Sequence, residues 1–186
     1  LLDWQGKPLL QYTLDLLKTQ NVFPFLALGG NSEQIMADKR VDLSGCELII
    51  VKDWQQGLSA SIRSVILHVV QKYEARQQIC RGVFIFLADQ PLITSQDIKK
   101  LFNEASRQPD MIICSQYVNT TEQQIAGVPA YFPFRYFEQL KLLSGDSGAK
   151  SLIESNEHVA VELENEMIDI DEPGDLVRAR EIQRSL

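Results

Sequence analysis

The stretch RGVFIFLADQPLIT, residues 81–94, decides the expected fold, because an unbroken apolar run leads directly into an acid. The run spans residues 83–87, and the acid is Asp89. Strands that are covered on both faces are continuously apolar rather than alternating, so the run predicts a buried central strand of a parallel sheet. Pro91 cannot donate a hydrogen bond to a neighbouring strand, and the strand is therefore expected to end before it.

The position of Asp89 favours a functional role, because ligands in open α/β sheets bind beyond the carboxyl ends of the strands, where Asp89 and Gln90 are expected to stand. The alternative is that Asp89 is a turn residue, since aspartate often forms local hydrogen bonds in turns. Further along, Thr94 predicts a helix start with Asp97 at the capping-box position, although Ser95 is an equally good cap.

Length and composition are those of one ordinary globular domain, with 186 residues of which 45% are hydrophobic and 23% charged. The net charge of −7 disfavours nucleic acid and anionic membrane surfaces as main partners, since both attract basic patches. No apolar run approaches the roughly 20 residues of a membrane helix, and no signal-peptide pattern stands at the start. Chemistry on small molecules fits these features better.

Cysteines and histidines give no sign of a disulfide framework or a zinc site. Cys46, Cys80 and Cys114 are widely spaced, odd in number and without a CxxC pair, so we interpret them as reduced thiols of a cytoplasmic protein. His68 and His158 have no second histidine or cysteine at ligand spacing, and we interpret both as structural.

Helices and strands are expected to alternate along almost the whole chain, with the clearest helix at residues 59–74, where apolar positions follow the i, i+3, i+4, i+7 rule. The other expected helices span residues 8–19, 31–37, 96–106, 135–142, 148–155 and 173–184. The expected strands span residues 22–28, 46–51, 83–87, 110–115, 127–132, 158–163 and 168–171, and residues 119–124 are expected to form an exposed loop. Pro129 marks the strand that contains it as irregular or as an edge strand. The alternation predicts a three-layer α/β fold around a mostly parallel, mixed sheet.

A first polar loop, DWQQGLSAS at residues 53–61, enters the long helix. Free amides at a helix start favour anions or carbonyl oxygens, and the hydroxyls of Ser59 and Ser61 are suited to hydrogen bonds with a heterocycle. The alternative is an ordinary serine cap, with Trp54 as a packing residue.

Two further segments carry acids beside turn residues. The first is GDSG at residues 145–148, which is either a ligand-binding turn or an ordinary tight turn followed by a helix cap. The second contains Asp169 and Asp171 before Pro173, where one of the two acids would also serve as a cap for the last helix.

Asp89 and Asp169 together offer what a hard divalent cation needs, namely a few carboxylate oxygens at strand ends, with water and substrate phosphates completing an octahedron. Magnesium is the inferred ion. Nucleotidyl or phosphoryl transfer depends on charge neutralisation and positioning more than on covalent help from the protein, which fits a chain without a recognisable histidine or cysteine nucleophile.

Five motifs occur in order along the chain and together resemble one family. They are DWQQGLSASIR (53–63), LADQPLIT (87–94), GVPAYF (127–132), GDSGAK (145–150) and DIDEPGDL (169–176). This ordered set resembles the molybdenum cofactor cytidylyltransferase family, a group of MobA-like nucleotidyltransferases. The pairing of LADQP with GDSGAK is far more specific than either motif alone.

The resemblance implies a fold of the nucleotide-diphospho-sugar transferase (Rossmann-like) type and a magnesium-dependent transfer of a nucleotide, with CTP favoured as donor, to molybdopterin with release of pyrophosphate. A molybdoenzyme or its chaperone is an expected further partner. Carried over, Asp89 and Asp169 match the catalytic, metal-binding acids. The residues implied for the nucleotide are Trp54, Gly57, Ser59 and Ser61, and those implied for the acceptor are Gly127, Gly145, Asp146 and Gly148.

One departure from the family pattern concerns the start of the chain. The family opens with a strand and a glycine-rich phosphate loop of the form LxAGxSxRMGxxK, and LLDWQGKPLL at residues 1–10 matches only the segment that follows it. Either the loop lies upstream of this sequence or the protein is a noncatalytic relative that binds a nucleotide or pterin. We favour the first alternative, because a sheet without its innermost strand leaves neighbouring edges unpaired. A third reading keeps the chemistry but changes the acceptor to a sugar phosphate, a polyol phosphate or phospholactate, with CTP, GTP or UTP as donor.

Overall fold

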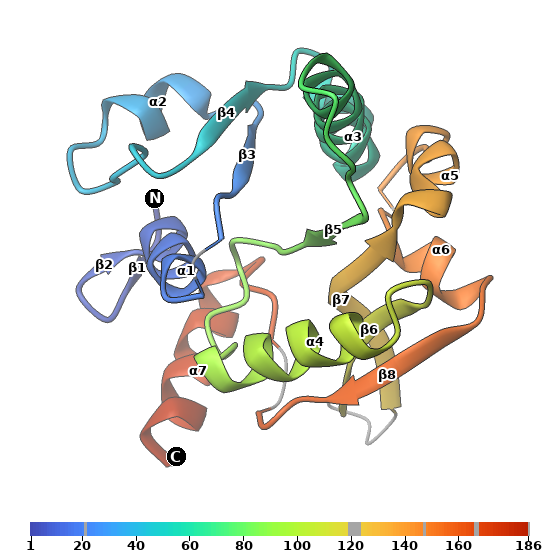
Figure 1. Cartoon of the computed structure of the whole chain (residues 1–186). Helices are drawn as coiled ribbons and strands as arrows, with labels where there is room; N and C mark the ends of the chain where they lie inside the picture. Colours follow the sequence, from blue (N-terminus) through green and yellow to red (C-terminus); the bar gives the residue numbers. More distant parts are fainter. Residues whose placement is uncertain (21, 119–123, 147, 166–167, 186) are drawn as a thin grey trace.

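The computed structural model describes residues 1–20, 22–118, 124–146, 148–165 and 168–185, and it confirms the predicted alternation of helices and strands (Figure 1). In chain order the elements are β1 (Asp3–Trp4), β2 (Lys7–Pro8), α1 (Leu9–Lys18), β3 (Phe25–Leu28), α2 (Ser32–Ala37), β4 (Glu47–Ile50), η1 (Trp54–Gln56), α3 (Leu58–Ala75), β5 (Gly82–Ile85), α4 (Ser95–Arg107), β6 (Ile112–Val118), β7 (Gln124–Pro133), η2 (Phe134–Tyr136), α5 (Phe137–Lys141), α6 (Lys150–Glu154), β8 (His158–Glu162) and α7 (Pro173–Ser185). None of the described helices is long and apolar enough to cross a membrane.

The main sheet has four strands in the order β5-β7-β6-β8. β7 is antiparallel to both of its neighbours, whereas β6 and β8 are parallel, so three of the four strands share one direction. A separate parallel pair joins β3 to β4, and β1 and β2 form a hairpin just before α1. The structure thus confirms a mixed sheet whose antiparallel strand lies in the second half of the chain.

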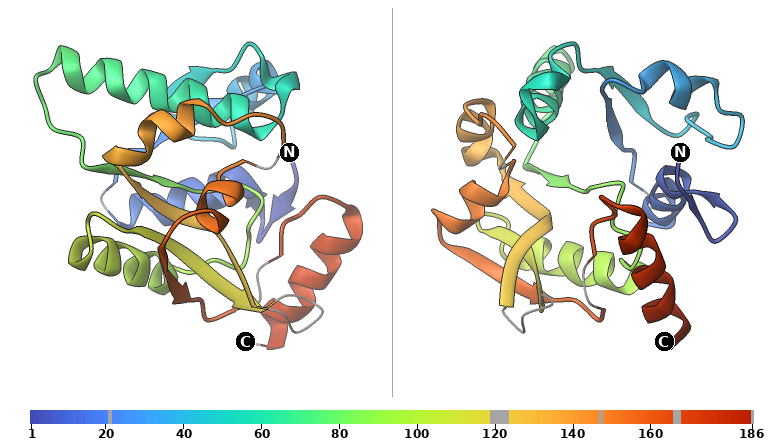
Figure 2. Two further views of the ribbon diagram at one scale, coloured as in Figure 1. Left: turned by 90° about the vertical axis from the view of Figure 1, so that its right-hand side faces the viewer. Right: turned by 180° about the vertical axis from the view of Figure 1, so that it is seen from behind.

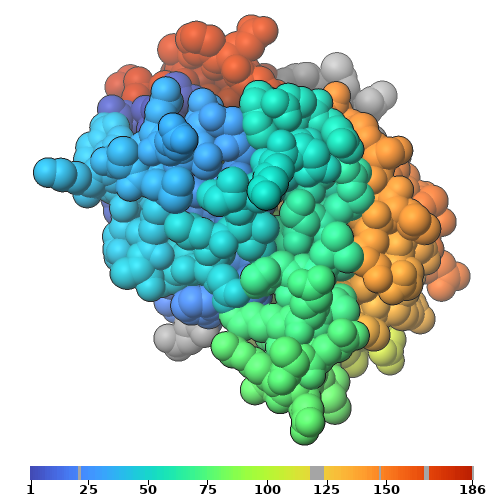
Figure 3. All heavy atoms as spheres, turned by 90° about the horizontal axis from the view of Figure 1, so that it is seen from above, coloured from blue at the N-terminus to red at the C-terminus, as the bar shows by residue number. Residues whose placement is uncertain are grey.

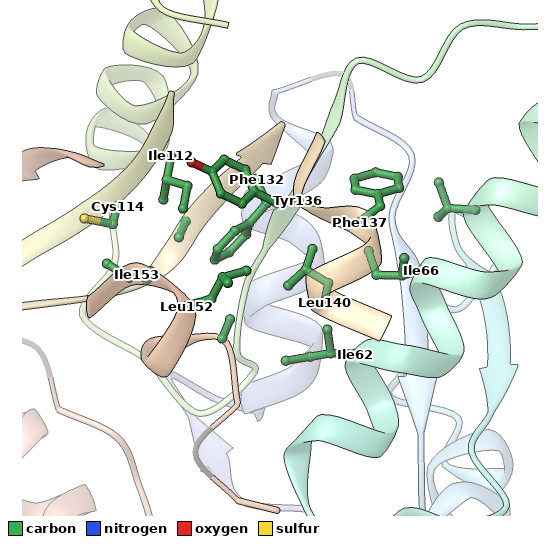
Figure 4. Packing of buried hydrophobic residues seen from close by; sticks show 13 residues of the cluster. Ile62, Ile66, Ile112, Cys114, Phe132, Tyr136, Phe137, Leu140, Leu152 and Ile153 are labelled. Carbon is green, nitrogen blue, oxygen red and sulfur yellow. The ribbon is translucent and has the colours of Figure 1, made fainter. Parts of the chain in front are cut away.

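Helices cover both faces of the main sheet, which gives the predicted three layers. On β6, Ile112 and Cys114 belong to the core on one face and Ile113 to the core on the other, as expected for side chains that alternate along a strand. Helices α3, α5 and α6 surround Phe132 on the first face (Figure 4). Helix α4 packs on the opposite face through Leu101, which is fully buried.

The start of α4 shows the predicted capping box and decides between the two candidate caps. Thr94 is the cap: its Oγ1 accepts from the Asp97 backbone N–H at 3.1 Å, and Asp97 Oδ2 accepts from the Thr94 backbone N–H at 3.0 Å. Asp97 Oδ1 also accepts from the backbone N–H of Glu164 at 3.0 Å, which ties the helix to the segment after β8. Asp97 therefore holds two distant parts of the chain together.

The strand that contains Pro129 is irregular, as predicted, but the expectation of an edge strand is wrong. β7 lies between β5 and β6. Its register with β6 shifts between Cys114 and Ser115, which pair with Ala130 and Gly127, so Pro129 falls in a bulge where no ladder donor is required. The carbonyl oxygen of Pro129 accepts instead from the buried Ser115 hydroxyl at 2.8 Å.

Three other expectations differ in detail. β5 is shorter than the apolar run 83–87 and half-buried instead of buried, because its second edge borders a groove described below. Residues 168–171 do not form a strand, although the backbone N–H of Ile170 donates to the carbonyl oxygen of Asp89 at 3.0 Å. The exposed loop expected at residues 119–124 lies, apart from its last residue, outside the described residues.

An apolar groove of about 420 Å³ lies between the β3 and β4 pair and the four-stranded sheet. Within the described residues β3 pairs only with β4, and β5 pairs only with β7, so each presents one unpaired edge to the groove. Views from the front and from behind show these two strands apart (Figure 1 and Figure 2). Side chains of α1 and α3, including Leu14 and Ile66, complete the lining. The groove therefore has two strand edges and two helices as its walls.

Candidate active site

Asp89 lies just beyond the carboxyl end of β5, as the sequence predicted. The hydrogen bond from the Ile170 backbone N–H to its carbonyl oxygen brings the segment with Asp169 and Asp171 alongside. Two acids that are 80 positions apart in the sequence are thereby assembled at one rim of the sheet. We call Asp89 and Asp169 the acid pair.

Gln90, which follows Asp89 in the chain, forms a hydrogen bond with the other member of the acid pair, Asp169. Its side chain is buried, and its Nε2 donates to Asp169 Oδ1 at 2.9 Å and, more weakly, to the Val128 carbonyl oxygen at 3.4 Å. Sequence reasoning placed Gln90 at the rim but gave it no role, because a partner 79 residues away leaves no local signal. The link fixes one oxygen of an otherwise exposed Asp169 carboxylate.

The environment of Asp89 disfavours its charge. Burial raises its pKa to about 6, and the negative charges of Asp169 and, less strongly, Asp171 act in the same direction. Its Oδ1 is buried and has no hydrogen-bond partner among the described residues. A buried carboxylate oxygen without a donor, next to a second carboxylate, is the environment that a bound cation would relieve.

The residues present fit a magnesium ion in number and type. In the described part of the chain no group of three or more acidic, histidine or cysteine side chains could hold a metal, so the acid pair offers two carboxylates only. Mg²⁺ is typically bound by one or two carboxylates, with water and substrate phosphates as the remaining ligands. The acid pair thus suits an ion that arrives with a nucleotide better than a permanent protein-caged metal.

Tyr117 is a neighbour of the acid pair that the sequence did not single out. Burial raises the pKa of its hydroxyl, and the charge of Asp169 raises it further. A methyl group on Gly127 would lie 3.3 Å from this hydroxyl, so Gly127, implied for the acceptor, lies directly beside Tyr117. The acid pair and Gly127 therefore belong to one region.

The loop before α3 packs closely against the loop after β3. Methyl groups added to Gly29 or Gly30 would lie within 3 Å of the Trp54 side chain, so two glycines permit the indole to lie on the backbone. About 45% of Trp54 nevertheless remains exposed. Ser61 lines the apolar groove. Trp54 therefore packs against Gly29 and Gly30 and also exposes part of its aromatic ring, so the structure is compatible with both a packing role and a binding role.

Arg63 organises this loop and was missed in the sequence analysis, where it was only the last letter of a motif. Its Nη1 donates to Ser59 Oγ at 3.2 Å and to the Leu143 carbonyl oxygen at 2.7 Å. Its Nη2 donates to Gln56 Oε1 at 2.8 Å and to Asp53 Oδ2 at 3.2 Å. Ser59 is fully buried, so its hydroxyl helps to hold the loop in shape through Arg63.

The loop at residues 57–59 touches the GDSG turn. The Ser59 backbone N–H donates to the Gly145 carbonyl oxygen at 3.3 Å, and a methyl group on Gly57 would collide with Asp146 Oδ1. Gly57 also has a φ of 91°, which side chains rarely adopt. From above, the teal segment at the start of α3 borders the orange segment of α5 and the turn (Figure 3). The residues implied for the nucleotide and for the acceptor therefore lie side by side.

The sequence predicted that Gly148 begins the following helix, and this prediction is wrong. Gly148 has a φ of 53° and packs under Leu58, whose Cδ2 would lie 2.7 Å from an added methyl group. The helix α6 starts at Lys150 after Ala149 and spans five residues, which is too short to provide an anion site of its own. Gly148 therefore contributes by allowing close packing of the turn on α3.

Residues 1–161 match the family profile described as MobA-like NTP transferase domain. The homologue of Mycobacterium tuberculosis Rv0371c from Mycobacterium sp. strain JC1 is similar in structure, with a TM-score of 0.78 and 24% identity over 100% of this chain and 88% of that chain. Rv0371c in complex with manganese has a TM-score of 0.74 and 24% identity over 97% and 90% of the two chains. No curated protein matches the sequence.

A more distant structural neighbour is molybdopterin-guanine dinucleotide biosynthesis protein A from Archaeoglobus fulgidus. Its TM-score is 0.63 and its identity 15%, over 100% of this chain and 90% of that chain. Identities of this size show a shared fold. They confirm the predicted nucleotide-diphospho-sugar transferase type of α/β architecture.

Proposed function

Since the chain belongs to the family of MobA-like NTP transferase domains and is therefore a nucleotidyltransferase, we propose that it transfers CMP from CTP to molybdopterin, with Mg²⁺ as the cofactor. The observation that carries the proposal is the acid pair: Asp89 has a buried Oδ1 with no hydrogen-bond partner among the described residues, and Gln90 donates a hydrogen bond to the neighbouring Asp169. This arrangement is suited to a cation and a triphosphate at the end of β5.

In the proposed reaction a phosphate oxygen of molybdopterin attacks the α-phosphorus of CTP. The new bond joins that oxygen to the α-phosphorus, and the bond from the α-phosphorus to the bridging oxygen of the β-phosphate breaks, so that pyrophosphate leaves. Asp89 and Asp169 would hold Mg²⁺, which supplies positive charge to the phosphates when bound. The protein contributes orientation and charge, and no covalent intermediate is required.

The neighbouring loops divide the two substrates between them in our proposal. Trp54, Gly57, Ser59 and Ser61 serve the cytidine side, where Trp54 offers an exposed ring and the loop offers backbone amides. Gly127, Gly145, Asp146 and Gly148 serve the pterin side, where carboxylate oxygens accept from the N–H groups of a pterin. Because Gly57 touches Asp146, the boundary between the two half-sites runs between these residues.

We also propose that a strand leading into a glycine-rich phosphate loop fills the groove between β3 and β5. The apolar walls, and two strand edges that pair with no other strand in the described residues, support a strand that is apolar on both faces and paired on both sides. The carboxyl end of such a strand would face the same rim as Asp89, which is where basic loop residues are needed for a triphosphate. Activity of residues 1–186 with and without such a preceding segment tests this; equal activity would contradict it.

Pyrophosphate release tests the function as a whole. Each of CTP, GTP, UTP and ATP is supplied with Mg²⁺ and either molybdopterin, a sugar phosphate or a polyol phosphate. We expect release only with CTP and molybdopterin. Pyrophosphate release with a sugar or polyol phosphate would support nucleotidyl transfer but to an acceptor other than molybdopterin. Binding of CTP without pyrophosphate release under any of these conditions would overturn the proposed activity.

Asp146→Ala tests the division between the half-sites. We expect a weaker affinity for molybdopterin, by about fivefold or more, because a pterin N–H loses its acceptor, and an unchanged affinity for CTP. Separate titrations with the two substrates measure this. A loss confined to CTP would move the turn to the nucleotide side.

A further inference from the structure

Gln90 has an unusual hydrogen-bonding pattern for a buried amide. Its Nε2 faces two acceptors, Asp169 Oδ1 and the Val128 carbonyl oxygen, which fixes the orientation of the amide because the opposite orientation would place oxygen against oxygen. Its Oε1 is buried and has no partner among the described residues. The amide nitrogen of Gln90 is therefore fully used, whereas its oxygen has no partner in the part of the chain that the structure describes.

A second buried glutamine in the same chain shows what a purely structural amide does. Gln11 Nε2 donates to Asp15 Oδ1 at 2.5 Å, and Gln11 Oε1 accepts from the Asp42 backbone N–H at 2.6 Å. Both ends are satisfied, as buried polar groups normally are. Gln90 resembles Gln11 in burial and in its carboxylate partner, but it differs by the unpartnered oxygen.

We propose that Gln90 is a positioning residue for the cation site: it holds the Asp169 carboxylate in the orientation that binds the divalent ion together with Asp89. The inference rests on the proposed function, since it assumes that the acid pair binds this ion. Asp169 is exposed, and among the described residues Gln90 is the only side chain that forms a hydrogen bond with it. Without Gln90 its carboxylate would rotate freely, and the ion would have to order it on binding.

The Oε1 atom of Gln90, which has no partner within the described ranges, also contributes to binding at this site. A buried amide oxygen costs free energy until it meets a donor. In the loaded site this oxygen accepts from a donor that accompanies the ion or the substrate, so that binding satisfies an acceptor that the protein itself leaves open. Gln90 is thus predicted to favour the occupied site over the empty one.

The test compares Gln90→Met with Gln11→Met, a matched change at a buried glutamine whose hydrogen bonds go to Asp15 and to the Asp42 backbone instead of to the acid pair. Mn²⁺ serves as the probe, and its binding is measured by the electron paramagnetic resonance signal of free Mn²⁺, without nucleotide and with CTP. We expect Gln90→Met to weaken Mn²⁺ binding about tenfold. Gln11→Met should leave Mn²⁺ binding unchanged and lower the thermal unfolding midpoint. Wild-type Mn²⁺ binding by a folded Gln90→Met protein would overturn the proposal.

Two further variants separate the possible failures. Gln90→Asn retracts the amide by one methylene group but keeps its polarity; we expect an intermediate loss of Mn²⁺ binding, and this variant decides the question if the methionine variant does not fold. Asp89→Asn tests the premise: if it binds Mn²⁺ like the wild type, the acid pair is not the ion site and the proposed function fails. If Asp89→Asn loses Mn²⁺ while both Gln90 variants keep it, only the role of Gln90 is disproved.

Discussion

Two aspartates, eight positions apart, show how differently the same side chain is used on either side of the loop after β5. Asp97 is almost completely buried and accepts hydrogen bonds from the Thr94 backbone N–H, the Thr94 hydroxyl and the Glu164 backbone N–H. Asp89 is half-buried, has a buried oxygen without a described partner, and faces the charge of Asp169. A carboxylate whose oxygens accept hydrogen bonds from the protein stabilises the fold. A carboxylate with an oxygen that lacks such a donor, beside another acid, is available to a ligand.

The largest expected effect comes from Asp89→Asn. The variant should keep the fold but lose activity by about a hundredfold to a thousandfold, because the site loses the charge that neutralises and positions the cation. Pyrophosphate release and the circular dichroism spectrum would be measured together. Asp171→Asn, a change at a nearby exposed acid, is the control and should retain activity. Wild-type turnover in the Asp89 variant would contradict the role of Asp89 as a ligand of the cation.

Asp97→Asn should have the reverse phenotype. The neutral amide oxygen is a weaker acceptor, and the amide nitrogen would face a backbone donor, so we expect a loss of about 3 kcal/mol in the free energy of unfolding. At a temperature where the variant is folded, its kcat should match that of the wild type. Urea unfolding and steady-state kinetics at 15 °C would measure both. A large loss of kcat without a loss of stability would place Asp97 in the site.

Asp169→Ala should raise the Mg²⁺ concentration needed for half-maximal activity by about tenfold, and Asp171→Ala should change it little. The sequence suggested that one of these two acids caps the last helix. In the structure the carboxylate that accepts from the backbone N–H groups of Asp171 and Glu172 is that of Asp175, so we expect Asp171→Ala to have little effect on stability as well. Magnesium titrations of the two variants decide the matter; a stronger dependence in Asp171→Ala would reverse the assignment.

The smallest expected effect is a gain in stability of the metal-free Asp89→Asn protein. The pKa of Asp89 is raised to about 6 in the folded state, while an aspartate in an unfolded chain has a pKa of about 3.9. The folded state therefore holds the proton more tightly, and the wild type loses stability as the pH rises from about 4 through 6. Asparagine avoids this loss.

After allowance for solvent screening of a partly exposed group, the gain should be about 1 kcal/mol at pH 8 and near zero at pH 4. Urea unfolding in the presence of a chelator at the two pH values measures it. Equal stability of variant and wild type at pH 8 would show that Asp89 is relieved in the free protein by groups other than a cation.

Features that depend on neighbouring residues were predictable from the sequence. The Thr94 capping box and the helix at residues 59–74 follow from patterns within a few turns, and both are confirmed. Asp89 and Asp169 were each located by their position relative to a strand or helix, and the structure brings them together. Local chemistry and elementary topology sufficed in these cases.

Features that depend on distant pairing were not predictable. Pro129 suggested an irregular or an edge strand, and the sequence did not show that a register shift between β6 and β7 places the irregular strand at the centre of the sheet. Gln90 contacts Asp169, Arg63 contacts the Leu143 carbonyl oxygen as well as its nearer neighbours, and Tyr117 lies beside Gly127; no periodicity or spacing in the sequence indicates these three contacts. The contact between Gly57 and Asp146 likewise arises only when two loops meet in space.

The groove between β3 and β5 has a consequence for local stability, because it interrupts the hydrogen bonding between strands. The pair β3 and β4 shares no hydrogen-bonded ladder with the four-stranded sheet in the described residues, so the two are joined through helices α1 and α3 rather than through a continuous sheet. Segments held mainly by side-chain packing open as local units below the energy of global unfolding. The β3 and β4 pair is therefore expected to unfold locally as a separate unit, and its backbone amides should exchange their hydrogens sooner than those of β6 and β7. A strand that pairs with both β3 and β5 in the groove would join the two units into one continuous sheet.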